Sequence, residues 1–394
     1  MMSYFKFILT FLIITFSASA SSFATIESNT TKGEQKVLVI LVKFPDLNPT
    51  FSAEKLKDKY FDKLDIYLKA VSYKKAWIKV KMTDWYTLPH NVDYYHISKH
   101  NFEVEKDKVT ALIQDVVNLA DEDEDFSNYD MLFISLGARQ RDYGMMGLCG
   151  YPGMLGWKNR LEIKTDKNGQ KVPEGVAIYC ENAHVGVVFH DMGHIMGGLK
   201  NGRRVLPCLY DHELQAQKGT FRLYYQFYLT NVGYFDPMSC HYYELKKFPP
   251  GLCAWSKIRL GWIESEKIVE VNKGKSETVL LAPLSSGYPK VHVVKVPVSS
   301  TTYYLIENRQ SIGPDENLPS YGVCIYYCDD EVAECLHGKT PVKMINANPS
   351  VSELKGAPFT LEGKSSFADE KNNVIVKLIE KEVDNYKIYV SNDK

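Results

Sequence analysis

Two histidines, His190 and His194, stand four residues apart in a mainly apolar segment. Residues at i and i+4 of a helix lie on the same face, one turn apart. Two imidazoles placed in that way can both reach one tetrahedral zinc ion, at about 2.0–2.1 Å. The apolar neighbours predict that the helix is buried, so that both histidines face a cleft inside the fold. These neighbours are Val185, Val187, Val188, Phe189, Met192 and Ile195.

Gly197 and Gly198 follow the second histidine and predict the end of the helix. Glycine takes the left-handed conformation at a helix C-terminus without penalty. The chain can therefore turn there and bring back a third metal ligand.

The bulk composition sets the class of protein. With 394 residues, the chain is long enough for two domains that each have a core. Its 47 Lys and Arg residues balance 48 Asp and Glu residues, and we find no basic stripe of the kind that binds nucleic acid. Nothing in the sequence indicates an oligomeric state.

Residues 1–24 read as a cleaved secretory signal peptide, which predicts a secreted or periplasmic protein. Lys6 precedes a short apolar run that ends near Phe16, and small residues before residue 24 offer cleavage sites. That run is about half of the ~20 residues that a membrane span needs, so we expect no stable span. An uncleaved signal anchor is the alternative.

The chain has eight cysteines, an even number that suggests disulfides in an exported protein. Cys240 with Cys253, and Cys328 with Cys335, are close enough in sequence to be plausible pairs. The alternative is that several of the eight are ordinary buried thiols.

The hydrophobic pattern predicts two domains after the signal peptide. Residues 25–264 read as an α/β catalytic domain. It has buried strands over 36–43 and 131–136, a strand of alternating character over 77–80, and helices over 53–71 and 103–120. An irregular stretch over 137–183 contains an edge strand over 176–179. Residues 265–394 hold six short strands separated by turn residues, which is typical of an all-β, sandwich-like domain.

Several segments along the chain, together with the histidine helix, resemble the immune inhibitor A-like family of secreted bacterial zinc metallopeptidases. They occur in the order expected for that family, and together they extend over most of residues 36–330. The segments are Val37–Asp46, Ser72–Trp77, Asp84–Pro89, Asp125–Asp130, Val232–Ser239, Ala254–Trp262 and Tyr303–Tyr326.

The resemblance implies a metzincin-like fold, one catalytic Zn²⁺ and hydrolysis of peptide bonds in a protein or peptide substrate. It implies His190 and His194 as zinc ligands and Met238 as the residue of a Met-turn beneath the metal. In that mechanism zinc lowers the pKa of a bound water towards ~7, and a carboxylate takes the proton.

The candidate base departs from the family pattern. Asp191 stands where the His-Glu-x-x-His motif has its glutamate. Aspartate is one methylene shorter, and a misplacement of about 1 Å can cost ~10²-fold in rate.

The third ligand departs from the pattern as well. The family supplies it from a Leu-Pro-Asp-x-Tyr-Asp run, and the matching run here begins at Leu206 with a cysteine, Cys208, at the ligand position. We favour Asp211 as the third ligand and keep Cys208 as the alternative, since a disulfide would withdraw its thiolate. His212 and Glu213 are also within reach.

Two functions remain open from the sequence. The first is an exported zinc-dependent endopeptidase with Asp191 as its base. The second is a catalytically inactive relative that binds peptides or a partner through the same cleft.

Overall fold

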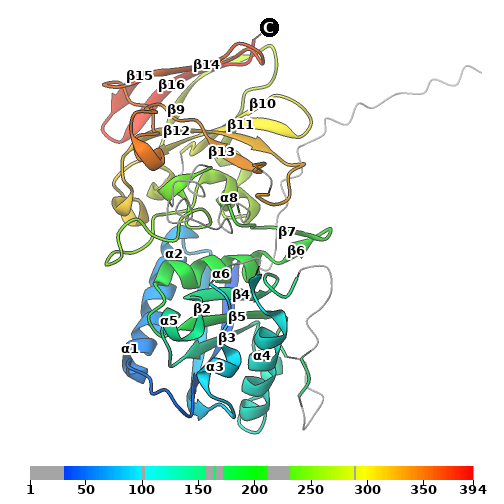
Figure 1. Cartoon of the computed structure of the whole chain (residues 1–394). Coiled ribbons are helices and arrows are strands. Elements are labelled where there is room, and N and C mark those ends of the chain that lie inside the picture. The colour runs from blue at the N-terminus through cyan, green and yellow to red at the C-terminus, as the bar shows by residue number, and fades with distance from the viewer. Residues whose placement is uncertain are drawn as a thin grey trace, which may run out of the picture.

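The chain forms a mixed α/β region followed by a β-rich region (Figure 1). This combination confirms the predicted fold class at that level, while the metzincin-like identity of the first region stays a prediction. A computed structural model describes residues 31–99, 103–156, 163–165, 172–211, 231–287, 290–336 and 338–393. The predicted signal peptide, residues 1–24, lies outside the described residues.

The α/β region is built on a five-stranded sheet in the order β2-β1-β3-β5-β4. Strands β1, β2, β3 and β5 run parallel, and β4 pairs antiparallel with β5. Strand β3 is buried along its whole length and β1 along most of it, which explains their continuous apolar sequences. The bounds are β1 Gly33–Lys43, β2 Ala76–Thr87, β3 Met131–Leu136, β4 Gly147–Tyr151 and β5 Gly175–Cys180.

Helices cover both faces of this sheet. Helix α4 shares a core with alternate residues of β1, β3 and β5 on one face, and α1, α2 and α6 pack on the other. A π-helical turn over Asp58–Lys63 joins α1 to α2, so the predicted helix over 53–71 is one nearly continuous element. The helix bounds are α1 Ala53–Lys57, α2 Leu64–Val71, α3 Val92–Tyr95, α4 Lys106–Ala120, α5 Gln140–Tyr143, α6 Val185–Gly197 and α8 Ala254–Arg259.

Two predictions for the segment before α6 are wrong. The strand over 176–179, predicted at an edge, is β5, which lies between β3 and β4. The stretch expected to be irregular contains β4, which forms the edge of the described sheet instead. Two of the five residues of β4 are glycines, so its sequence lacks the run of apolar side chains that would predict a strand. Gly147 is needed because a Cβ there would lie 2.6 Å from Val187 Cγ1 on α6.

The β-rich region consists of two sheets that pack face to face. Their orders are β13-β12-β11-β10-β8 and β14-β15-β16-β9, and their inner faces share one hydrophobic core. The six predicted strands correspond to β9, β10, β11, β12, β15 and β16. The bounds are β8 Ile268–Glu270, β9 Ser276–Leu281, β10 Val293–Pro297, β11 Thr302–Arg309, β12 Gly322–Asp329, β13 Val342–Met344, β14 Ser366–Asp369, β15 Val374–Glu382 and β16 Asn385–Ser391.

The two regions share a hydrophobic core. Successive side chains of a strand point to opposite faces, and β11 uses both of its faces. Tyr304 and Ile306 face the core between the two β-sheets, whereas Tyr303 and Leu305 belong to the core that also contains α6 and α8. The β-rich region therefore supports the region that carries the histidine helix. No helix within the described ranges has both the length and the apolar character needed to cross a bilayer.

All eight cysteines are free thiols in the structure. The predicted pairs Cys240–Cys253 and Cys328–Cys335 are therefore not formed. Each sulfur has separate surroundings: Cys240 Sγ lies 3.4 Å from the Tyr242 carbonyl, and Cys253 and Cys328 are packed inside the shared core. Short separation in the sequence did not bring the sulfur atoms together.

Candidate metal centre

Helix α6 begins and ends at residues suited to those positions. His184 is its N-cap and accepts a hydrogen bond from the backbone of Gly186 at 3.0 Å. Gly198 follows the helix with φ +59°, and its N–H donates to the carbonyl of His194 at 3.0 Å. The chain then forms a short hairpin, β6 Leu199–Lys200 and β7 Arg203–Arg204, and returns beneath the helix. The glycines end the helix as predicted.

Three donor atoms meet beneath α6. Nε2 of His190 and Nε2 of His194 lie 3.0 Å apart, and Cys208 Sγ lies 3.4 Å and 3.3 Å from them. All three side chains are buried. With ordinary zinc–nitrogen and zinc–sulfur lengths, the ligand atoms of a tetrahedral site lie about 3.3–3.6 Å apart. The group therefore has the donor types and nearly the spacing of a zinc site.

The other nitrogen of each ring fixes the direction of these donors. His190 Nδ1 lies 3.0 Å from the Pro237 carbonyl, and His194 Nδ1 lies 2.7 Å from the Leu206 carbonyl. A carbonyl only accepts, so each Nδ1 carries the proton and each neutral ring presents a lone pair at Nε2. Two lone pairs 3.0 Å apart repel each other unless a metal ion or a shared proton lies between them. Burial also lowers the pKa of His190, which favours the neutral form that binds metal.

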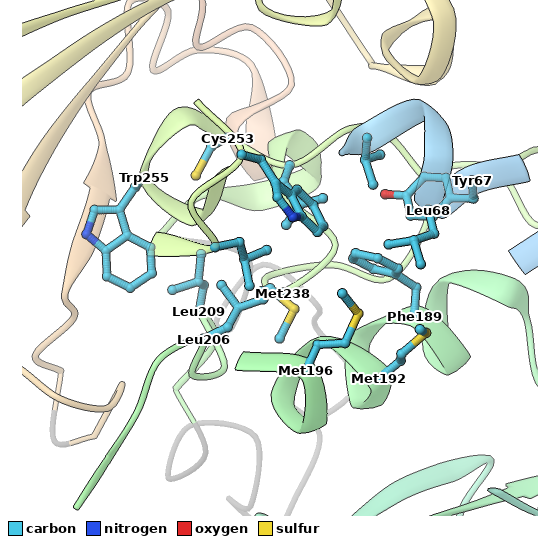
Figure 2. Packing of buried hydrophobic residues seen from close by; sticks show 14 of the residues in the cluster. Tyr67, Leu68, Phe189, Met192, Met196, Leu206, Leu209, Met238, Cys253 and Trp255 are labelled. Carbon is cyan, nitrogen blue, oxygen red and sulfur yellow. The ribbon is translucent and has the colours of Figure 1, made fainter. Parts of the chain in front are cut away.

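Met238 lies against α6 beside the histidines, and its role in a Met-turn stays a prediction. A Cβ on Gly193, between the two histidines, would lie 3.3 Å from Met238 Sδ. Buried Asp236 holds this turn: Oδ1 accepts from the Met238 N–H at 2.8 Å, and Oδ2 accepts from the Cys253 N–H at 2.9 Å. Figure 2 shows Met238 among the side chains of Met192, Met196, Leu206 and Leu209.

A buried ion cluster of the β-rich region supports the same turn. Arg309 on β11 pairs with Glu307 at 2.9 Å and with Asp315 at 2.6 Å, and all three side chains are fully buried. The Arg309 guanidinium also donates to the Phe235 carbonyl at 2.9 Å. Sequence reasoning placed Glu307 and Arg309 in a family motif without assigning them a task. Their contacts show that they join the second region to the turn that carries Met238.

Asp191, the candidate base, is buried beside β4. Its Oδ2 atom has no hydrogen-bond partner among the described residues and lies 3.4 Å from the Cβ position of Gly147. Burial raises the pKa of Asp191 to about 7, while His190 and the backbone of Cys149 act in the opposite direction. A carboxyl with such a pKa can exchange a proton near neutral pH.

Asp211 does not join the donor group. Its Oδ2 accepts a hydrogen bond from the backbone of Gly338 at 2.8 Å, so the carboxylate is held by a loop of the β-rich region. Within the described ranges, the group of His, Cys, Asp and Glu side chains that could share a metal consists of His190, His194 and Cys208. His212 and Glu213 lie outside the described residues.

Two rings that sequence reasoning did not assign to the site flank His190. Tyr210 stacks on it with ring centroids 5.6 Å apart, and His241 meets it edge-on at 4.5 Å. His241 Nε2 is buried without a hydrogen-bond partner among the described residues, and burial holds its pKa well below the usual range. Tyr210 was detectable only as part of the Cys208 loop.

Comparisons with known proteins assign no relative to this chain. A scan against protein-family models gives no match, and a search of curated proteins finds no matching sequence.

Proposed function

We propose that the chain holds one zinc ion with His190, His194 and Cys208 and acts as an exported zinc-dependent endopeptidase. The observation that carries the metal proposal is the pair of Nε2 atoms 3.0 Å apart, each with its Nδ1 atom facing a carbonyl. Three protein ligands leave the fourth position of a tetrahedral zinc open, which is the arrangement of catalytic rather than structural sites.

Peptide hydrolysis follows from the chemistry that this group would supply. A bound zinc ion lowers the pKa of water towards ~7 and polarises a carbonyl group. Asp191, next to His190 on the helix, would take and return the proton. The packing of Met238 against the helix and the resemblance of the sequence to secreted metallopeptidases support a peptide bond as the target.

A specific observation favours the second candidate, an inactive relative that binds peptides or a partner. Asp191 is packed beside β4, where its free oxygen lies next to Gly147. Its side chain is one methylene shorter than the glutamate of the family motif. A base that cannot reach the water would leave a metal-binding cleft with little turnover.

The test combines elemental analysis of the purified protein with cleavage of unfolded casein, with and without a zinc chelator. We expect about one zinc per chain and cleavage that the chelator abolishes. His190→Ala should lose both properties, and the matched control His90→Ala, at an exposed histidine, should keep both. Zinc without cleavage would select the inactive relative, and absence of zinc would contradict both metal-based proposals.

A further inference from the structure

A pocket lies between α8 and the β-rich region, and none of its lining residues belongs to the metal centre. Its volume is about 180 Å³. Helix α8 contributes Trp255 and Arg259, and the β-rich region contributes Lys295 and Asp330, among others. Sites for drug-sized ligands usually measure ~300–1,000 Å³, so this pocket suits a smaller molecule.

Arg259 places a buried cation in this pocket. The residue is only 8% exposed, its Nε donates to the Val205 carbonyl at 2.6 Å, and its guanidinium stacks on Trp255 at 4.4 Å. Among the described residues, no hydrogen bond involves its two terminal nitrogens, and the nearest carboxylate, Asp330, lies 3.8 Å from Nη1. A buried guanidinium is normally paired and hydrogen-bonded, so these terminal N–H groups are available to a ligand.

In this pocket the positively charged side chains are more deeply buried than the negatively charged ones. The side chains of Arg259 and Lys295 are 10% and 9% exposed, whereas those of Asp330 and Glu270 are 28% and 38% exposed. Lys295 Nζ lies 3.6 Å from Glu270, and the Tyr303 hydroxyl donates to Asp330 at 3.2 Å. Cations therefore lie deep and carboxylates lie at the rim, with opposite charges 3.6–3.8 Å apart.

This order of charges matches one small molecule in particular. An α-amino acid carries a carboxylate and an ammonium group on a single carbon, so its opposite charges are also close neighbours. Its carboxylate would accept hydrogen bonds from buried cations, while its ammonium would meet carboxylates at the mouth. Ile258 and Leu305 supply apolar walls for a side chain.

We propose that this pocket binds a free α-amino acid with an apolar side chain. The carboxylate lies on Arg259 and Lys295, and the ammonium lies between Glu270 and Asp330. This assignment goes beyond the proposed peptidase activity and does not depend on it, because it uses no metal ligand.

Isothermal titration calorimetry of the full chain tests the proposal with three probes: L-leucine, 4-methylpentanoate, which lacks the ammonium, and L-leucinamide, which lacks the carboxylate. We expect saturable binding of L-leucine at one site. Each analogue should bind at least about tenfold more weakly, the loss expected for one charge-assisted hydrogen bond.

Variants locate the site. Arg259→Gln and Lys295→Met should each weaken L-leucine binding by about tenfold or more, while Arg141→Gln, at a side chain 80% exposed, should leave it unchanged. Because the two deep variants alter buried groups, Glu270→Gln at the rim provides a second test. It should reduce the preference for L-leucine over 4-methylpentanoate, because Asp330 alone then faces the ammonium. No saturable binding of L-leucine, equal binding of 4-methylpentanoate, or equal effects of Arg259→Gln and Arg141→Gln would overturn the proposal.

Discussion

Nε2 of His190 and Nε2 of His194 lie 3.0 Å apart, with Cys208 Sγ within 3.4 Å of both. The Nδ1 atom of each ring faces a backbone carbonyl, so both lone pairs point towards the same place. Backbone carbonyls are common partners of metal-bound histidines because they fix the tautomer and the ring orientation. The following predictions depend on this arrangement and on the core that supports it.

Cys208→Ser is expected to weaken zinc binding by about 100-fold or more. Removing a residue that only hydrogen-bonds to a metal ligand costs about 10- to 100-fold in affinity, and removing a ligand itself should cost at least as much. Asp211→Asn should change zinc affinity little, because the Asp211 carboxylate is held by the backbone of Gly338. Competition with a chromogenic chelator measures both. Cys240→Ser, at a thiol outside the donor group, is the matched control. A larger loss in Asp211→Asn than in Cys208→Ser would reverse the ligand assignment.

Asp191→Asn is expected to keep zinc and to lower the rate of casein cleavage by ~10²–10⁴-fold, because the amide cannot take a proton. The measurement is kcat for the wild type and the variant at equal zinc content. Equal rates would show that Asp191 is not the base.

Asp191→Glu separates a weak enzyme from an inactive one. The extra methylene moves the carboxylate by about one carbon–carbon bond, a scale on which ~10²-fold changes in rate occur. An increase in cleavage over the wild type would show that reach limits the natural residue. No cleavage by either protein, with zinc bound in both, would favour the peptide-binding alternative.

Arg309→Gln is expected to destabilise the fold by about 3–5 kcal/mol, since it leaves the buried carboxylates of Glu307 and Asp315 without their cation. The loss should reach the metal centre, because Arg309 also donates to the Phe235 carbonyl in the turn before Met238. Urea unfolding of the zinc-free protein measures the free energy of unfolding. Arg203→Gln, at an exposed arginine, is the control. A change below about 1 kcal/mol, typical of a surface pair, would contradict this role.

Lys257 predicts a dependence of stability on pH. Its ammonium is fully buried without a hydrogen-bond partner among the described residues, and burial lowers its pKa from 10.5 to about 8. Between pH 8 and 10.5 the unfolded chain therefore binds more protons at this residue than the folded chain does. The contribution of Lys257 to the free energy of unfolding must therefore rise with pH across that window. Below pH 8 both states are protonated, so Lys257 lowers the free energy of unfolding by a constant amount.

Lys257→Met should remove this dependence. We expect the free energy of unfolding of the wild type, relative to the variant, to increase by roughly 2 kcal/mol between pH 8 and pH 10. Below pH 8 the variant should be the more stable protein. Taking the difference between the two proteins cancels the titration of other groups. A difference that does not change with pH would show that Lys257 is solvated or paired.

The helix that carries the two histidines was predictable because its signals are local. Spacing places His190 and His194 on one face, and Gly198 follows the end of the helix with a positive φ. The sequence near the helix could not decide between Cys208 and Asp211 as the third ligand. The Asp211 carboxylate is held by the backbone of Gly338, which lies far along the chain. The same holds for His241, which only the fold brings against His190.

Local sequence patterns also predicted only part of the five-stranded sheet. Apolar runs predicted β1 and β3, but β4 carries too few side chains to produce a pattern. Gly147 is required by the close approach of α6, which no local signal reveals. Arg309 also looked like a strand residue in a motif, and only its contacts connect it with the turn before Met238.

X-ray absorption spectroscopy at the zinc edge of the purified protein tests the metal centre most directly, because it counts sulfur atoms around the metal. We predict one sulfur at about 2.3 Å together with nitrogen or oxygen atoms at about 2.0–2.2 Å. The sulfur should disappear from the spectrum in Cys208→Ser. A shell of nitrogen and oxygen alone in the wild type, or a protein that takes up no zinc, would contradict the proposed centre.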